Sequence, residues 1–582
     1  MQYRISDFLK SVEFKIILIA VFLRLFGVTS PYISDESMLS ETVRYMHMGN
    51  FDPMVLDPAT NTVIPPNIGI PHPPMGILLY FLGTAIFGVI PLGMRLTPLL
   101  LGIGVMCMTY FLSKRLYGRK TAILTLALMA FSFYSVWGSL YIDYDGAILS
   151  FFVTSAIYSY VRFRDDGENN AFWLRLSAIF LGLALLTKYS ALMVIPVILL
   201  AELLYAVKER NFGIRKIAAS AYPAIGILFV GAIIFSIFPI LSFLSGRWGS
   251  FLYTFSYGGN TLFTDTVQSQ FHTLSAIAMS FAKDMVFILQ YATPLIPILV
   301  LLSFRNRSGR EAILYSWISV FLIFYTLLVP GGGKVRYLMI LIPPLYILAA
   351  RGLLAFPAIG KKTAIYAALL SVAFLGIIFA LNTYGSMKTF NTHNLGMQTV
   401  IDNGFFWYGG HGSSVFAIHI QSFIFVVALS ALLFAASFKK SYFLNALLAI
   451  LALSIAFNGF ILFQSFHPTV GPDYRATLEA IAADYKDTEG PIYGITQFRN
   501  ALNIYFGGER VGYTGLLLNR DAAGNFNWSM PDMKGSKVIV IDAELMDNPM
   551  FIEPVGRFLS KNCTLEKKYY SNNYPFGYVY NC

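Results

Sequence analysis

The sequence predicts a mainly α-helical protein that crosses a membrane many times and ends in a small extracytoplasmic α/β domain. Of its 582 residues, 56% are hydrophobic and only 13% are charged, whereas soluble proteins carry about 25% charged residues. Apolar runs of about 20 residues, long enough for a helix to cross the hydrocarbon core, recur through most of the chain. Residues 467–582, by contrast, hold 24 of the 73 charged residues. We therefore expect a transmembrane domain over residues 1–466 and a soluble domain over residues 467–582.

The basic residues predict a cytoplasmic N-terminus and about 13 transmembrane helices. Lysine and arginine are enriched in cytoplasmic loops, and 22 of the 31 bases in residues 1–466 form clusters that fit one side of the membrane. The first cluster precedes the first span, and the acidic segment 31–73 then fits an external loop. Later spans are expected at about 95–115, 121–138, 146–162, 174–188, 190–207, 217–242, 274–304, 311–329, 338–351, 363–384, 417–438 and 442–463.

The apolar run 75–92 is interpreted as a helix that lies at the outer face. If it crossed the membrane as well as the run that follows, the basic cluster at residues 114–120 would fall outside. Residues 31–94 are therefore expected to form the first external loop, with amphipathic interfacial helices.

The remaining composition excludes several classes of function. The net charge of +11 comes from a surplus of lysine and arginine in the loops between spans. Such a surplus indicates membrane topology, so no nucleic-acid partner is predicted. Three cysteines are too few for a disulfide framework or a zinc cluster, although Cys563 and Cys582 can pair in an oxidising space. No Walker loop, dinucleotide fingerprint or HExxH motif supports an ATP-driven pump or a nucleotide-sugar enzyme.

Acidic and imidazole side chains in the first external loop are the leading catalytic candidates. Asp35 and Glu36 follow the first span closely, where a carboxylate can act as a general base or bind a divalent ion. The alternative is a solvated pair that begins a helix after the N-cap residue Ser34. His72 is flanked by prolines and can contact a phosphate or a metal, unless it is an ordinary surface histidine.

Positive charges at the outer ends of spans indicate an anionic ligand. Snorkelling to headgroups or pairing with a structural acid is the alternative for each of them. The bases concerned are Arg24, Arg44, Arg95, Lys188, Arg247, Lys283, Lys334, Arg336 and Lys388.

Two of these segments suit a phosphate best. Lys188 lies among hydroxyl residues at the end of a hairpin of spans, and Lys334, Arg336 and Tyr337 follow three glycines that permit close approach to an anion. In the external turn 141–146, Asp143 and Asp145 could order the loop, bind a sugar or pair with exterior bases.

Taken in order, these motifs resemble the GT-C membrane glycosyltransferases over about residues 14–351. They are Asp-Glu after the first span, HPPxG before an amphipathic run, an acidic turn, a Leu-Thr-Lys hairpin and Lys-x-Arg-Tyr before a Pro-Pro span. The resemblance is to the group that joins dolichyl-phosphate-mannose-protein mannosyltransferases with bacterial aminoarabinose transferases. Members transfer a sugar with inversion from a polyprenyl phosphate, on the extracytoplasmic side of the membrane.

The resemblance implies a role for each candidate residue. Asp35 would be the general base and Glu36 its neighbour in acceptor or sugar binding, while His72 matches the histidine of the mannosyltransferase HPP motif. Lys188, Arg336 and Tyr337 match positions associated with the lipid phosphate. Where aminoarabinose transferases have Glu-Lys, this chain has Pro71 and His72, so neither aminoarabinose nor lipid A is implied.

Several assignments stay open at this stage. The acceptor is a protein, a glycan or a lipid, and no cofactor is required, although a divalent cation near Asp35, Glu36 and His72 is an alternative. The competing function is a multi-pass secondary transporter or flippase of an anionic or lipid-linked substrate. The sequence disfavours it because no internal repeat is found and the unusual charges gather at one face.

Overall fold

The computed structural model describes most of residues 11–355 and 474–582. The larger gaps inside these ranges are residues 30–34, 50–54, 57–62, 65–71, 167–170, 209–213, 253–276, 305–308, 329–335, 495–501, 507–510, 521–525, 530–533 and 542–555. Lys334, the expected spans at 363–384, 417–438 and 442–463, and the predicted domain boundary after residue 466 therefore lie outside the described residues.

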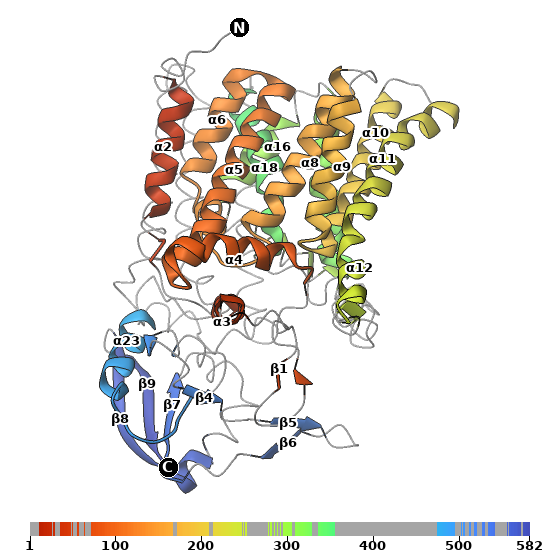
Figure 1. The fold of residues 1–582 in the computed structure, drawn as a ribbon. Helices are drawn as coiled ribbons and strands as arrows, with labels where there is room; N and C mark the ends of the chain where they lie inside the picture. The colour runs from red at the N-terminus through yellow and green to blue at the C-terminus, as the bar shows by residue number, and fades with distance from the viewer. Residues whose placement is uncertain are drawn as a thin grey trace, which may run out of the picture.

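The membrane part is a bundle of long apolar helices, as predicted (Figure 1). Its elements are α2 (Val12–Leu25), α5 (Pro91–Tyr117), α6 (Arg119–Ala130), α7 (Phe133–Gly138), α8 (Ala147–Asp166), α9 (Ala171–Leu185), α10 (Val194–Lys208), α11 (Ile214–Phe235), α12 (Ile237–Leu244), α16 (Leu295–Ser303), α17 (Ala312–Leu328) and α18 (Ile342–Ala355). Short 3-10 turns, η2 (Tyr189–Met193) and η3 (Tyr337–Leu341), lead into α10 and α18.

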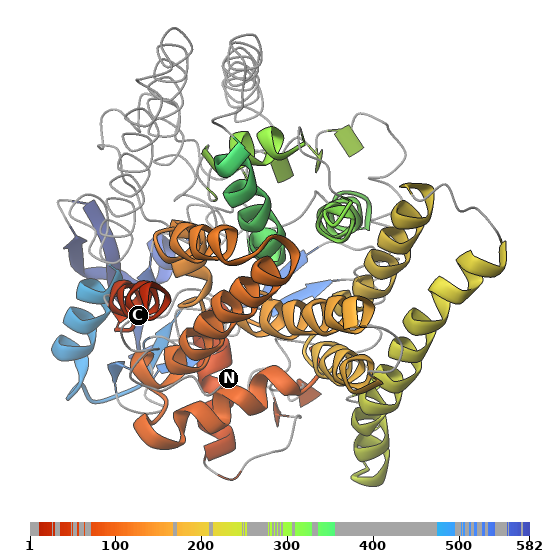
Figure 2. The ribbon, with the colours of Figure 1, turned by 90° about the horizontal axis from the view of Figure 1, so that it is seen from above.

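Length and apolar surface fit these helices to a bilayer. Within the described part of the chain, the helical stretches 91–117, 189–208, 222–244 and 337–355 are long and apolar enough to cross a membrane. Helix α11 lies on the opposite side of the bundle from α2 (Figure 2) and exposes large side chains such as Tyr222 and Phe229. Such a face would be costly in water and is typical of contact with lipid. The total of about 13 spans stays a prediction.

One expected span is broken into two helices. The run 121–138 forms α6 and the short α7, and Ser132 lies at the break. The Ser132 hydroxyl accepts a hydrogen bond from the Ser135 amide at 3.2 Å, which caps the new helix. Uniform apolarity hid this break, so the prediction of one continuous helix here was wrong.

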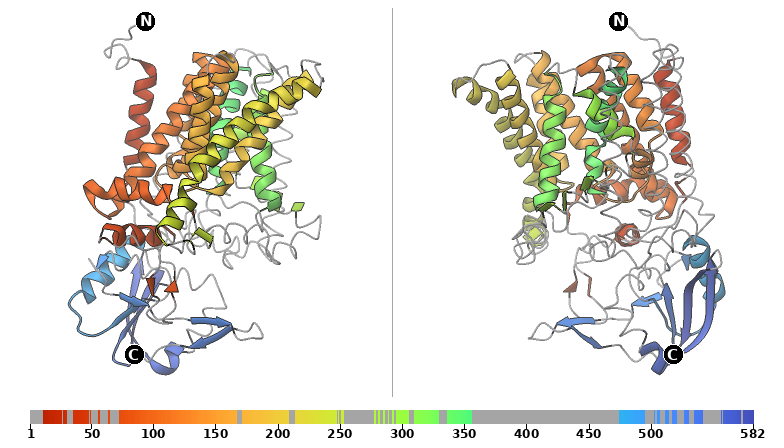
Figure 3. Two further views of the ribbon diagram at one scale, coloured as in Figure 1. Left: turned by 45° about the vertical axis from the view of Figure 1, so that its right-hand side comes forward. Right: turned by 180° about the vertical axis from the view of Figure 1, so that it is seen from behind.

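Two further helices lie across one end of the bundle. Helix α4 (Met75–Phe87) runs across the ends of the spans, and α3 (Asp35–His47) lies beside it on the side away from the bundle (Figures 1 and 3). Short strands β1 (Val55–Leu56) and β2 (Val63–Ile64) belong to the same connecting region. The expectation that the run beginning at residue 75 lies at a membrane face is consistent with this arrangement.

The C-terminal segments form an α/β unit at the same end as α3 and α4 (Figures 1 and 3). A mixed sheet has the order β4-β3-β7-β9-β8, and helix α23 (Tyr474–Tyr485) packs through Leu478 and Ile481 against its core. The strands are β3 (Ile492–Gly494), β4 (Val511–Tyr513), β7 (Lys537–Ile541), β8 (Thr564–Ser571) and β9 (Tyr574–Asn581), with a separate hairpin of β5 (Leu517–Arg520) and β6 (Phe526–Ser529).

A disulfide joins Cys563 to Cys582 at the end of this unit. The two cysteines flank β8 and β9, which pair antiparallel from Thr564 opposite Asn581 onwards. The bond therefore closes the open end of the terminal hairpin, and it realises the pairing that the sequence left open.

Candidate active site

A tightly packed turn between α7 and α8 forms the centre of the candidate site. It carries both acids of the predicted acidic turn, and its glycines leave no space for side chains. A Cβ atom added at Gly146 would lie 2.9 Å from the Gly138 carbonyl oxygen and 3.3 Å from the Met339 sulfur. Real Cβ atoms essentially never approach closer than about 3 Å, so this backbone is held in place by the end of α7 and by η3.

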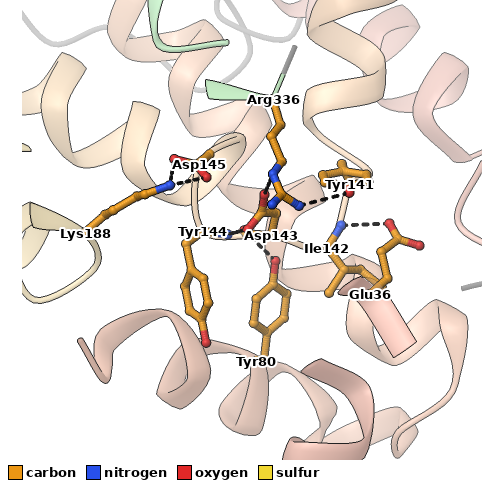
Figure 4. A network of polar contacts seen from close by, with 9 residues as sticks. All are labelled: Glu36, Tyr80, Tyr141, Ile142, Asp143, Tyr144, Asp145, Lys188 and Arg336. Carbon is orange, nitrogen blue, oxygen red and sulfur yellow. Dashed lines mark hydrogen bonds and ion pairs between the residues drawn. The ribbon is translucent and has the colours of Figure 1, made fainter. Parts of the chain in front are cut away.

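The first acid of the turn, Asp143, is held by its own backbone and by Arg336. Its Oδ1 accepts a hydrogen bond from the Tyr144 amide at 2.7 Å, and its carbonyl accepts one from the Tyr80 hydroxyl at 2.9 Å. The Arg336 Nε lies 3.2 Å from Oδ2, and Arg336 also reaches the Tyr141 hydroxyl at 3.5 Å (Figure 4). Asp143 therefore links α4, the turn and the segment before η3.

The second acid, Asp145, forms an ion pair with Lys188. The ammonium nitrogen of Lys188 lies 2.6 Å from Oδ1 and 2.5 Å from Oδ2 of Asp145 (Figure 4). The Lys188 side chain is 14% exposed and the Asp145 side chain is 2% exposed. Lys188 also lies over the Tyr337 ring, 4.1 Å from its centroid. Burial acts against the charged form of Lys188, but Asp145, Tyr337 and Asp143 outweigh it and raise its pKa above the usual value, so the ammonium stays charged.

The predicted acidic pair begins α3, and its second member is fully buried. Glu36 forms a bidentate ion pair with Arg95 of α5, with distances of 2.8 and 2.7 Å. Arg95 also donates to the Leu140 carbonyl, and the Ile142 amide donates to Glu36 at 3.0 Å. The start of α3 is thereby fixed to the acidic turn. Asp35 is the residue before Glu36, and its side chain lies outside the described residues.

His72 approaches the same turn from the start of α4. Its ring meets the Tyr144 ring edge to face, with centroids 5.0 Å apart. The Tyr144 ring fills the space over Gly76, where a Cβ atom would lie 1.9 Å from Cδ1. Burial first, and then the charges of Lys188 and Arg336, lower the His72 pKa well below its usual value. The imidazole is therefore neutral near pH 7 and offers one donor and one acceptor.

A backbone hydrogen bond joins two further predicted segments of the site. The Met75 amide at the start of α4 donates to the Leu186 carbonyl at 2.9 Å, which joins the HPPxG segment to the hairpin that carries Lys188. Four predicted segments thus converge on the predicted acidic turn. They are α3, the start of α4, the hairpin before η2 and the segment before η3.

Most of the predicted site residues come together, and the structure adds others. Glu36, His72, Asp143, Asp145, Lys188, Arg336 and Tyr337 all lie at or beside the turn. Sequence reasoning flagged Arg95 only as a base on the unexpected side, and it missed Tyr80 and Tyr144. No sequence signal marks Tyr80, whereas Tyr144 lies between the two predicted acids.

The described residues contain no group of three His, Cys, Asp or Glu side chains that could hold a metal ion. Both carboxylate oxygens of Glu36 accept hydrogen bonds from Arg95. Glu36 is therefore already paired with a cation in this structure. A cation near Asp35, Glu36 and His72 stays a prediction.

The chain shares its overall fold with a solved structure, and this likeness together with the apolar helical bundle confirms the predicted mainly α-helical, polytopic fold class. The chain is similar to the crystal structure of ArnT from Cupriavidus metallidurans bound to undecaprenyl phosphate, with a TM-score of 0.58, 14% identity and 97% of both chains covered. The apo form of that protein gives a TM-score of 0.58 and 13% identity, with coverage of 98% of this chain and 96% of the other.

Sequence comparison finds relatives for part of the chain. Residues 71–243 match the family described as dolichyl-phosphate-mannose-protein mannosyltransferase. An uncharacterised protein of Aquifex aeolicus (strain VF5) is 32% identical over 204 residues, which are 34% of this chain and 39% of that relative. The chain thus spans well under half of the length of this relative. The matched family segment contains the acidic turn, His72 and Lys188.

Proposed function

We propose that this chain is an inverting glycosyltransferase that moves a sugar from a polyprenyl-phosphate donor to an acceptor. The observation that carries the proposal is the convergence of two cations from distant segments, Lys188 and Arg336, on one turn beside the helix that begins with Asp35. A donor with a phosphate and a reaction that requires a base would use both features.

The cations would bind the donor through its phosphate. Arg336 offers a planar fork of donors that suits phosphate oxygens, and Lys188 offers a compact charge. As the bond between the sugar and the phosphate oxygen breaks, the electron pair stays on that oxygen and negative charge grows there. Fixed cations at this position lower the barrier because they stabilise the transition state more than the ground state.

Asp35 would supply the base. The acceptor hydroxyl attacks the anomeric carbon from the face opposite the phosphate, and its proton passes to the Asp35 carboxylate. Attack from that face inverts the configuration of the sugar. Neutral His72 and the Tyr337 hydroxyl would contribute hydrogen bonds near the phosphate.

Glu36 would act through position and not through contact with the substrate. The sequence suggested a catalytic role for it, but its buried ion pair with Arg95 favours a role in holding the start of α3 against the turn. We propose that Glu36 and Arg95 are positioning residues for Asp35.

The site is proposed to face the extracytoplasmic side of the membrane. In Figures 1 and 3, α3, α4 and the C-terminal unit lie at the end of the bundle opposite the start of α2, and the charged turn contacts α3 and α4. With a cytoplasmic N-terminus, the site would face the extracytoplasmic side of the plasma or inner membrane. The C-terminal domain, proposed to span residues 467–582, would lie there as well and could contact the acceptor.

The proposal is tested with purified protein in nanodiscs and a short-chain polyprenyl-phosphate mannose as the donor. Release of polyprenyl phosphate in the presence of peptide, glycan and lipid acceptors is measured alongside donor binding. Asp35→Asn is expected to lower turnover about 100-fold or more with donor affinity retained, in line with the usual contribution of a general base. Lys188→Ala and Arg336→Ala are expected to weaken donor binding.

Asp165→Asn is the matched control, because Asp165 pairs with Arg115 at the far end of α8. Full turnover in correctly folded Asp35→Asn would refute the general-base assignment. In sealed proteoliposomes, movement of the donor across the bilayer without cleavage would instead support the transporter or flippase alternative.

A further inference from the structure

The acidic turn matches each of the two cations with a carboxylate. Lys188 lies 2.6 and 2.5 Å from the oxygens of Asp145, and Arg336 lies 3.2 Å from Asp143. All four side chains are at most 15% exposed. We call these four side chains the charge-balanced site. With each charge matched, the site is close to neutral before any phosphate arrives.

A site of this kind responds differently to the donor and to the product. The proposed donor is a phosphodiester with one negative charge. The released polyprenyl phosphate is a monoester whose second pKa is about 6, so it carries a charge of about −1.5 to −2 at pH 7. Coulomb energy scales with the product of the charges. A carboxylate beside the phosphate therefore repels the product more strongly than the donor.

We propose that Asp145 sets the preference of this site for the singly charged donor over the doubly charged product, and thereby promotes release of the lipid phosphate after transfer. This inference rests on the proposed function. Cations alone would bind the product most tightly at the end of each cycle. The carboxylate of Asp145 would return to Lys188 as the phosphate leaves and would restore the ion pair.

Asp145 is the better residue to test of the two acids. Both of its oxygens contact Lys188, so its replacement changes mainly the charge at that cation. Asp143 also accepts from the Tyr144 amide, and its carbonyl accepts from Tyr80. A change at Asp143 would therefore disturb the shape of the turn as well as its charge.

The test compares the binding of two probes by the full-length protein in nanodiscs of zwitterionic lipid. The probes are farnesyl phosphate, which stands for the product, and farnesyl-phosphate mannose, which stands for the donor. Asp145→Asn is expected to tighten binding of farnesyl phosphate about tenfold more than binding of the mannosyl diester. Asp145→Glu is expected to keep the ratio of the wild type, because it keeps the charge.

The control is Asp165→Asn, the same substitution at the other end of α8. It removes the same charge from the protein at a site distant from the turn, so the ratio of the two dissociation constants is expected to stay unchanged. A loss of packing alone would weaken both probes together. Only a local charge effect changes their ratio.

A second measurement on the wild type keeps the inference testable if Asp145→Asn does not fold. Between pH 5.5 and 7.5, farnesyl phosphate gains its second charge, while Lys188 and Arg336 stay charged and His72 stays neutral. Asp143 and Asp145 are the acids that face these two cations. Affinity for farnesyl phosphate relative to the diester is therefore expected to stay level or to fall as the pH rises.

The outcomes separate the two claims. If both probes bind and Asp145→Asn leaves their ratio unchanged, or if the relative affinity for farnesyl phosphate rises about tenfold with pH in the wild type, the role given to Asp145 is wrong and the proposed function stands. If neither probe binds to the wild type, the proposed function itself fails.

Discussion

The ion pair between Glu36 and Arg95 should be one of the costliest contacts in the protein to break. The two side chains are 0% and 4% exposed and meet through two hydrogen bonds. Arg95→Met removes the cation but leaves the Glu36 carboxylate buried, and breaking a buried pair in this way costs about 3–5 kcal/mol. The double variant Glu36→Gln/Arg95→Met leaves neither charge, so it is expected to be more stable than Arg95→Met alone.

Unfolding in mixed micelles, followed by circular dichroism, measures these differences. Arg162→Met is a control, because Arg162 pairs with Asp166 one turn along the same helix and the two side chains are 30% and 23% exposed. Its loss should cost less than about 1 kcal/mol. Arg95→Met should also lower turnover more than donor affinity, since it releases α3. A cost below about 1 kcal/mol for Arg95→Met, or strictly additive single and double variants, would refute this account of the pair.

Three further predictions concern packing, pH and the disulfide. Gly76→Ala places a Cβ 1.9 Å from the Tyr144 ring and should lower the free energy of unfolding by about 1–3 kcal/mol in the same assay. Adding Tyr144→Leu should restore part of this stability. A purely additive result would contradict the contact. The folded-state pKa of His72 lies below its unfolded value of about 6.5, so the unfolded state binds the extra proton and stability falls as the pH drops below about 6.5, by up to about 1.4 kcal/mol at pH 5.5. His72→Asn should lose less over that range, and equal slopes for the two proteins would count against a buried neutral imidazole. Cys563→Ser/Cys582→Ser removes a disulfide that spans 19 residues and should lower the stability of the C-terminal unit by about 3 kcal/mol. Limited proteolysis should then cleave this unit faster. Unchanged cleavage would argue against a stabilising bond.

The charge pattern of the sequence predicts that the run beginning at residue 75 lies at a membrane face, but it did not predict the break between α6 and α7. Counting bases on the two sides placed the run that begins at residue 75 at a membrane face, because only that placement kept residues 114–120 cytoplasmic. The structure lays α4 across the end of the bundle. The break at Ser132 depends on one hydroxyl that caps a helix, and an average over about 20 apolar residues does not register a single cap.

The candidate site was likewise only partly predictable from the sequence. Each motif marked a side chain whose charge was unusual for its place in the membrane topology, and this was enough to gather Glu36, Lys188 and Arg336 as candidates. Which acid pairs with which base depends on the packing of segments far apart in the chain. Sequence reasoning therefore left three roles open for Asp145, and the structure shows that it pairs with Lys188. Arg95 carried the right signal, a base on the outer side, but its partner could not be named.

The most direct measurement of the central claim is a cryo-electron microscopy structure of the full-length protein with a bound polyprenyl phosphate. The account predicts the phosphate within about 3 Å of the Lys188 ammonium and the Arg336 guanidinium, the usual distance for charge-assisted hydrogen bonds. Asp35 should lie on the side of the phosphate where the sugar would be, within reach of an acceptor hydroxyl. A phosphate bound at the other end of the bundle, beside Arg115 and Arg119, would contradict the account.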